Sequence, residues 1–348
     1  MRQLAGWLRA AGRAALIATS RPARGEVAVS YGHRRLPAPG EPVEGGMVKF
    51  QRLQSAFPHR PSDFNLLYLG SSSLPSNERT AISLARRRRA PIVLNQDGVA
   101  YPAWAGADTQ RLNARLRHVL QAATHVVYQS EYCKHAADEF LGPPRGSWEI
   151  LHNAVDTRAF TPAERPPEGS PVLLLAGDQS QAYRLETALE TLALLPDARL
   201  LVTGSLVVDA VQVAERRGVA GRVELAGRYA QRDAPALFRR AHVLLHPKVR
   251  DPCPNVVLEA LACGVPVVHS ASGGVPELVG EAGIGVPSET TWERDVPPAP
   301  AELAEAVRSV LGRLEGYRQA ARARAVERFD LQPWIERHHR LFEELVRL

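Results

Sequence analysis

The sequence is poor in cysteine, with three residues, Cys133, Cys253 and Cys263, in a chain of 348. They form no CxxC pair and are not spaced from histidines as zinc ligands would be, which excludes the zinc-finger classes of protein. Each cysteine is better interpreted as a small buried side chain than as a ligand or nucleophile. Since the sequence also contains no Asp-x-Asp pattern, we expect no bound metal, and a reducing cytoplasm is the simplest setting.

Long apolar runs are also absent, because no stretch of the sequence approaches the roughly 18 apolar residues of a membrane-spanning helix. The run at residues 14–18 is too short for the core of a signal peptide, so we expect neither secretion nor integral membrane insertion. Residues 1–24 place apolar and basic side chains on opposite faces of a helix. This segment is a helix packed on its own domain, a frayed leader, or a peripheral contact with the anionic inner face of a membrane. The apolar face carries Leu4, Trp7, Leu8, Ala11 and Ala15, and the basic face carries Arg2, Arg9 and Arg13.

The sequence lacks a GxGxxG pattern after either early strand with an acidic residue about 20 positions on, which excludes a dinucleotide-dependent dehydrogenase. It contains no nucleic-acid-binding module, and its basic residues are scattered rather than interleaved with aromatic ones. The net charge of +6 nevertheless favours anionic partners. Nucleotide diphosphates and anionic lipids fit this charge better than nucleic acid does.

Strand-like and helix-like segments alternate twice along the chain. With 45% hydrophobic and 23% charged residues, the composition is that of a soluble globular protein of two domains. Each alternation predicts a parallel sheet with crossover helices, and the Pro-rich residues 163–170 predict a linker. A second Pro-rich stretch, residues 290–300, predicts an irregular excursion of the chain. We therefore expect an N-terminal domain over 25–162, a C-terminal domain over 171–330, and a last amphipathic helix over 331–348. Predicted strands lie at 26–30, 64–69, 91–94, 124–129, 172–176, 199–203, 223–225, 243–245 and 265–268. A helix is expected over 130–140, with Ser130 as its cap.

The stretch from His246 to Val268 is the most informative part of the sequence. Its two prolines at 252 and 254 predict an irregular loop, and Gly264 predicts the end of a short helix over 255–263. On this helix Glu259 lies opposite the apolar residues 257, 258 and 261. We expect Glu259 to face a cleft; the simpler alternative is a solvated surface glutamate.

This stretch resembles the signature of retaining glycosyltransferases of family 4. That signature has two carboxylates separated by seven residues around a Pro/Gly loop and a short helix, followed by a Cys-Gly-x-Pro-Val-Val turn. The resemblance implies that Glu259 accepts hydrogen bonds from the nucleotide ribose and that Asp251 lies beside the donor sugar. Asn255 and Val256 would belong to the same donor site. The family usually has glutamate where this chain has Asp251, which is one methylene shorter.

The resemblance implies a GT-B fold, in which two Rossmann-like domains face a cleft. It also implies transfer of a sugar, with retention, from a nucleotide diphosphate sugar to a hydroxyl acceptor, with no cofactor besides this co-substrate. A second match spans residues 148–162, where the usual residue types recur. These are Asn153, Val155, Asp156, Phe160 and Pro162.

Glycine pairs precede two predicted helices. Gly45 and Gly46 come before the helical run at 47–57, and Gly273 and Gly274 begin the turn into the helix that contains Glu277. Such turns bring backbone amides close to an anion, although most glycines of this kind are simply turn residues. The resemblance places both pairs, together with Gly204, near the donor.

Several basic residues are candidates to bind the donor diphosphate. The family normally has an arginine and a lysine after the strand at 172–176, whereas this chain has Asp178 at the arginine position and Arg184 within one residue of the lysine. Lys248, Arg228 and Arg250 are the alternatives, and spacing does not choose among them.

A polar stretch follows the strand at 91–94, at the sheet edge where α/β proteins bind ligands. Many family members have a histidine there, and this chain has Gln96 and Asp97, so we include Asp97 with Asp251 among the catalytic candidates. Tyr101 and Trp104 either stack on a sugar or are buried. The competing hypothesis is a non-catalytic sugar-nucleotide or glycan-binding protein on the same scaffold, and a third is a sugar-nucleotide epimerase of related fold.

Overall fold

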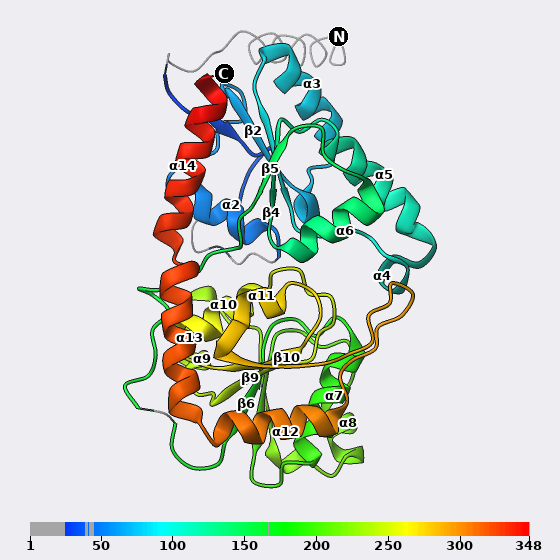
Figure 1. Ribbon diagram of the computed structural model, residues 1–348, viewed down its shortest axis with the longest axis vertical. Coiled ribbons are helices and arrows are strands. Elements are labelled where there is room, and N and C mark those ends of the chain that lie inside the picture. The colour runs from blue at the N-terminus through cyan, green and yellow to red at the C-terminus, as the bar shows by residue number, and fades with distance from the viewer. Residues whose placement is uncertain (1–24, 39–40, 42–44, 166, 348) are drawn as a thin grey trace, which may run out of the picture.

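The computed structural model describes residues 25–38, 41, 45–165 and 167–347, so the proposed interfacial helix at 1–24 lies outside the described residues. Within them the chain forms two parallel sheets, each in its own α/β domain (Figure 1). The expected fold class, two Rossmann-like domains, is confirmed. The N-terminal sheet has the order β1-β2-β3-β4-β5, with β1 (Val29–Ser30), β2 (Leu66–Gly70), β3 (Ile92–Gln96), β4 (His125–Tyr128) and β5 (Ser147–Ile150).

The C-terminal sheet has the order β11-β10-β9-β6-β7-β8. Because the chain runs outward from β6 in one direction and from β9 in the other, the loops that follow these two strands meet at a topological switch point. Open α/β sheets bind their ligands at such points. The strands are β6 (Val172–Leu175), β7 (Arg199–Thr203), β8 (Val223–Gly227), β9 (Val243–His246), β10 (Val267–Ser270) and β11 (Gly283–Val286).

Helices cover both faces of each sheet, as Figure 1 shows. In the N-terminal domain they are α2 (Met47–Gln54), α3 (Glu78–Arg88), α4 (Pro102–Ala105), α5 (Thr109–Leu120) and α6 (Glu131–Leu141). In the C-terminal domain they are α7 (Ala182–Ala193), α8 (Ala210–Arg216), α9 (Ala234–Phe238), α10 (Asn255–Ala262), α11 (Val275–Val279), α12 (Pro300–Leu311) and α13 (Leu314–Arg328). The last helix is α14 (Leu331–Arg347).

The first crossover of the N-terminal sheet differs from those after it. Side chains of β2 alternate between faces, so Leu66 and Tyr68 pack with α2 and α14, whereas Leu67 and Leu69 pack with α3, α5 and α6. The chain therefore passes from β1 to β2 on one face and from β2 to β3 on the other, while the strand order continues in one direction. The β1–α2–β2 crossover thus has the opposite hand to β2–α3–β3, and α2 does not cover the α3 side of the edge strand β1.

Helices α13 and α14 run along one side of both domains (Figure 1). α13 packs against α10 of the C-terminal domain, and α14 packs against the N-terminal core through Trp334 and Phe342. The chain passes from one domain to the other at Asp330. There Val155 donates to the carbonyl oxygen of Phe329 (2.8 Å), and Leu331 donates to that of Val155 (3.0 Å).

His338 of α14 is fully buried. One ring nitrogen lies 3.1 Å from the hydroxyl of Tyr68 and the other 2.9 Å from the carbonyl oxygen of Trp334. Burial lowers the pKa of His338 to about 4, because desolvation disfavours the charged ring. Its pKa in the unfolded chain is about 6.5, so between these values the unfolded state binds more protons than the folded state.

The stabilisation from the neutral His338 is therefore complete above about pH 6.5 and is lost as the pH falls towards about 4. We expect this histidine alone to remove about 3 kcal/mol from the free energy of unfolding across that range. Denaturant unfolding of a His338→Gln variant should show a shallower pH dependence, and the exposed His118→Gln should behave like the unsubstituted chain. Equal slopes for all three proteins would contradict this assignment.

Candidate functional site

The loop that follows β9, and helix α11 that follows β10, lie against the N-terminal domain. The hydroxyl of Ser130, which caps α6 as expected by accepting from the amide of Cys133, donates to the carbonyl oxygen of Pro252 at 2.9 Å. The carboxylate of Glu277 in α11 accepts hydrogen bonds from the first two amides of α6, at 2.8 and 3.0 Å. A carboxylate at this position also complements the helix dipole. The residues around Asp251 are thus held from both domains.

Glu259 lies at the boundary between the domains, but its side chain is not open to solvent. It is 4% exposed, accepts a hydrogen bond from Nε2 of Gln231 (2.9 Å), and lies 3.9 Å from the guanidinium of Arg52 in α2. Burial raises the pKa of Glu259, and the charge of Arg52 only partly offsets this. The expected cleft-facing glutamate is instead covered by one side chain from each domain, both of them polar.

Asp251 is a buried carboxylate with two nitrogen partners. Nε2 of His246 and Nζ of Lys248 each lie 3.1 Å from its Oδ2 atom. Burial alone would raise the pKa of Asp251, but the charge of Lys248 and the hydrogen bond from His246 hold it far below its ordinary value. Burial also lowers the pKa of His246. We therefore assign a charged Asp251 between a neutral imidazole and an ammonium group.

The four proposed diphosphate cations have different partners. Arg184 donates to the carbonyl oxygens of Asp178 (2.6 Å) and Ala176 (3.3 Å), so it supports the loop after β6. Arg250 is buried and binds residues 291–295, so its guanidinium supports protein structure. The side chains of Lys248 and Arg228 are 29% and 63% exposed, which makes these two the accessible cations.

Asp178, which stands at the family's arginine position, has a structural partner. Its Oδ1 atom accepts hydrogen bonds from the amide and hydroxyl of Ser205, both at 2.6 Å, and its Oδ2 atom lies 3.4 Å from Arg228. The loop after β6 is thus tied to the loop after β7. Asp178 therefore acts as an internal hydrogen-bond acceptor between these two loops.

The predicted glycines allow segments to approach closely. A Cβ atom on Gly274 would lie 2.0 Å from the carbonyl oxygen of Pro252, and its amide already donates to the carbonyl oxygen of Asp251 at 2.9 Å. Gly273 and Gly204 adopt positive φ angles of 71° and 87°. Gly273 lies against the backbone of Asp251 in the loop after β9, and Gly204 lies against Gly177 in the loop after β6. Val256 packs beside Gly177. Gly46 lies against Ser72, and Gly45, with a φ of 51°, has open space around it. These glycines shape the loops, and their contact with phosphate stays a prediction.

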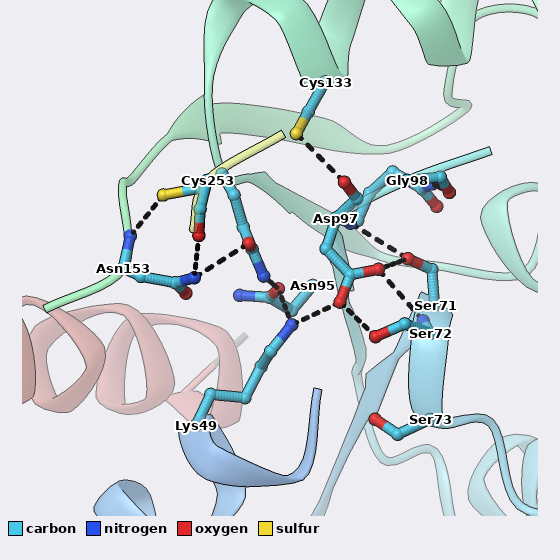
Figure 2. A network of polar contacts seen from close by, with 12 residues as sticks. Lys49, Ser71, Ser72, Ser73, Asn95, Asp97, Gly98, Cys133, Asn153 and Cys253 are labelled. Atoms are coloured by element: carbon cyan, nitrogen blue, oxygen red, sulfur yellow. Dashed lines mark hydrogen bonds and ion pairs between the residues drawn. The ribbon is translucent and has the colours of Figure 1, made fainter. Parts of the chain in front are cut away.

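Asp97 belongs to a buried polar network at the carboxyl end of the N-terminal sheet, shown in Figure 2. Its carboxylate accepts from Lys49 (2.7 Å), from the amide of Ser72 (2.9 Å) and from the hydroxyls of Ser71 and Ser72. Burial by itself would raise the pKa of Asp97, but Lys49 and the serine hydroxyls lower it overall. A carboxylate has about four acceptor positions, so Asp97 contacts a substrate only by exchanging one of these partners.

The same network continues to the C-terminal domain. Lys49 and Gln129 both donate to Oδ1 of Asn95, at 2.8 and 2.7 Å, and Asn153 donates to Gln129 (3.0 Å) and to the carbonyl oxygen of Cys253 (2.9 Å). Figure 2 shows this chain of hydrogen bonds ending at the loop that contains Asp251. The predicted Asn153 thus joins the two domains beside the candidate site.

Sequence reasoning missed two features of this region. Arg52 follows the Gly45–Gly46 turn by less than two helical turns, but its position opposite Glu259 depends on domain packing. The surroundings of the aromatic residues after β3 were also missed. Tyr101 lies under the guanidinium of Arg250, 4.7 Å from ring to cation, and contacts Trp292, whereas Trp104 is mostly exposed. Only the Pro-rich composition of residues 290–300 signalled an unusual segment there.

An open groove of about 690 Å³ lies in the N-terminal domain, away from Asp251 and Glu259. It runs along α3 on the side of β1 that α2 leaves uncovered, with Phe64 and Leu84 among its apolar residues. None of the described residues that line it is acidic. Its arginines are Arg34, Arg79, Arg87 and Arg88.

Among the described residues, no three or more His, Cys, Asp and Glu side chains are grouped as metal ligands. No helix in the described part of the chain combines the length and hydropathy that a membrane crossing requires. The absence of a metal requirement and the membrane contact of residues 1–24 stay predictions.

Solved structures of GT-B glycosyltransferases resemble this one. Sucrose-phosphate synthase from Thermosynechococcus elongatus matches with a TM-score of 0.68 and 17% identity, over 85% of this chain and 76% of that one. Anabaena HepE in complex with UDP matches with a TM-score of 0.68 and 20% identity, over 81% and 79%. The chain therefore has the GT-B fold.

The family model that matches this sequence covers most of the C-terminal domain. Residues 170–313 match the model of the family described as glycosyl transferases group 1. The D-inositol 3-phosphate glycosyltransferase of Mycobacterium sp. (strain KMS) is 28% identical over 146 residues, 38% of this chain and 33% of that protein. The phosphatidylinositol N-acetylglucosaminyltransferase gpi3 subunit of Schizosaccharomyces pombe is 26% identical over 219 residues, 60% of this chain and 45% of that protein. The matches thus span a third to just under half of these relatives.

Proposed function

We propose that the protein is a retaining glycosyltransferase of family 4 that transfers a sugar from a nucleotide diphosphate sugar to a hydroxyl acceptor. The observation that best supports this proposal is the position of Asp251 and Glu259. Both lie at the switch point of the C-terminal sheet, within the residues that match the glycosyl transferases group 1 model. Lys248 and Arg228 supply accessible positive charge beside the same loops.

The ribose hydroxyls of the donor would bind the carboxylate of Glu259 in place of Arg52 and Gln231. Charged hydrogen bonds of this kind are stronger than neutral ones, so exchanging one set for another is feasible when the domains separate. Lys248 would then share its charge between Asp251 and the departing diphosphate. As the bond from the anomeric carbon to the phosphate oxygen breaks, the acceptor oxygen bonds to that carbon from the same face, and its proton passes to the leaving phosphate oxygen.

The comparisons indicate which donors and acceptors to test first. HepE was solved with UDP and with UDP-glucose, so UDP-sugars are the first donors to try. The two curated relatives are named for acceptors that carry phosphate.

Titration calorimetry with UDP, GDP and ADP, followed by turnover assays with the matching sugar nucleotides, tests this function. We expect one nucleotide to bind, slow hydrolysis of its sugar donor, and faster consumption with a phosphorylated polyol than with the unphosphorylated one. Binding without turnover for every acceptor would favour the non-catalytic alternative. A new sugar nucleotide formed without any acceptor would indicate an epimerase.

Turnover should not depend on a divalent cation. Lys248 and Arg228 supply the positive charge that a metal would otherwise bring to the diphosphate, and the described residues offer no metal-ligand cluster. We therefore expect the rate to remain within about twofold after dialysis against a chelator. A loss that added Mg²⁺ or Mn²⁺ restores would overturn this prediction.

A further inference from the structure

A segment of the C-terminal domain reaches the N-terminal domain on the side opposite α13 and α14. This strap, residues 287–299, connects β11 to α12 and extends to α4 (Figure 1). Its Trp292 ring lies nearly perpendicular to that of Phe140, with centroids 4.9 Å apart, and also contacts Tyr101 and Tyr132. The amide of Ala103 donates to the carbonyl oxygen of Trp292 at 2.8 Å. The strap is thus anchored in an aromatic pocket of the N-terminal domain.

The strap also holds Arg250, the residue before Asp251. The guanidinium of Arg250 donates to the carbonyl oxygens of Thr291 and Arg294 and pairs with the carboxylate of Asp295. Arg250 is a non-glycine residue with a φ of 53°. That left-handed conformation costs about 1–2 kcal/mol, so the strap contacts offset the strain at the residue that precedes Asp251.

Asp295 connects the strap to the second loop of the switch point. Its Oδ1 atom binds Arg250, and its Oδ2 atom accepts a hydrogen bond from Gln181 at 2.9 Å. Gln181 lies in the loop after β6, immediately before α7. One carboxylate therefore ties together the loop after β6 and the loop after β9.

We propose that Arg250 is a positioning residue for Asp251, and that docking of Trp292 in the N-terminal domain sets its conformation. The strap thereby couples contact between the domains to the orientation of the catalytic carboxylate. α13 and α14 join the domains on one side and the strap joins them on the other, so separation of the domains requires Trp292 to leave its pocket. The role in turnover rests on the proposed glycosyltransferase function, whereas the coupling to domain separation does not.

The domain coupling is tested by distance measurement. The three native cysteines are buried, so exposed Ser83→Cys in α3 and Glu215→Cys in α8 provide one labelling site in each domain. We expect a single narrow distance distribution in the labelled chain and a broader one, shifted to longer distances, after Trp292→Ala. Trp292→Phe should restore the narrow distribution, and Trp148→Ala, at an exposed tryptophan outside the strap, should leave it unchanged. An unaltered distribution in Trp292→Ala would overturn the coupling, whether or not the protein transfers sugars.

The positioning role is tested by kinetics with Asp295→Asn, which keeps the packing of Trp292 and removes the charge that holds Arg250. We expect kcat to fall by about 10²-fold, as for a displaced catalytic group, with the UDP dissociation constant within about twofold and the label distance unchanged. Asp295→Glu should recover part of kcat. An unchanged kcat in Asp295→Asn would refute the positioning role, while absence of turnover in the unsubstituted protein would instead refute the proposed function.

Discussion

Replacement of Glu259 by glutamine is expected to weaken binding of the donor nucleotide by about 10- to 100-fold. A carboxylate accepts hydrogen bonds from both ribose hydroxyls, and a hydrogen bond to a charged group contributes about 1.5–3 kcal/mol. Glutamine has nearly the same volume but is neutral and has a single acceptor oxygen. Titration of UDP into the two proteins measures the difference directly.

The glutamine variant is preferable to alanine because of Arg52. Both substitutions break the buried ion pair with Arg52, which costs about 3–5 kcal/mol. Glutamine keeps a side-chain oxygen near the guanidinium, whereas alanine would leave Arg52 with Asn255 and the carbonyl oxygen of Ala154. The double variant Arg52→Met with Glu259→Gln avoids that cost and should fold well yet bind equally weakly. The exposed pair Arg240–Glu224 supplies the control, since Glu224→Gln should not alter affinity. Full nucleotide affinity in Glu259→Gln would remove the basis for placing the ribose there.

Local patterns in the sequence were sufficient to predict most of the elements, although β11 was not among the predicted strands. β7 spans residues 199–203 as expected, and Ser130 caps α6 as its position before an apolar helix indicated. β1 is shorter than predicted, covering only Val29–Ser30, because just these two residues pair with β2. The order of strands was not predictable, since alternation indicates a parallel sheet but not the face on which α2 crosses.

The partners of the candidate residues depend on tertiary packing. Periodicity placed Glu259 away from the apolar face of α10, but Arg52 lies more than 200 residues earlier and reaches it only because α2 meets α10 across the domain boundary. Likewise, Lys49 of α2 binds Asp97, which follows the end of β3, only because the fold brings these two segments together. Proline content marked residues 290–300 as irregular, yet it carried no information on the aromatic pocket that receives Trp292. Side-chain pairing between distant segments is therefore where the sequence alone was insufficient.

Replacement of Asp251 by asparagine is expected to lower kcat by about 10²- to 10³-fold with a smaller effect on donor affinity. In the proposed reaction this carboxylate lies beside a sugar carbon that gains positive charge, and a fixed group that stabilises developing charge contributes an effect of this size. Asparagine also leaves Lys248 without its counter-ion. Asp251→Glu should not act as a simple rescue, because an extra methylene in this buried site beside His246 and Lys248 costs about 1–3 kcal/mol.

The dependence of kcat on pH distinguishes the effect of the Asp251 charge from the effect of a change in the shape of the site. Because Lys248 and His246 hold the pKa of Asp251 far below its ordinary value, the carboxylate stays ionised and should cause no loss of rate between pH 5 and 8. Lys248→Met removes the closest charge, so the pKa of Asp251 should rise and an acid limb should appear as the pH falls. The acid limb should be absent both in Asp251→Asn and in the double variant Asp251→Asn with Lys248→Met. An acid limb that is the same in Lys248→Met and in the double variant would arise from another group, and Asp251 would then not be the carboxylate beside the donor sugar.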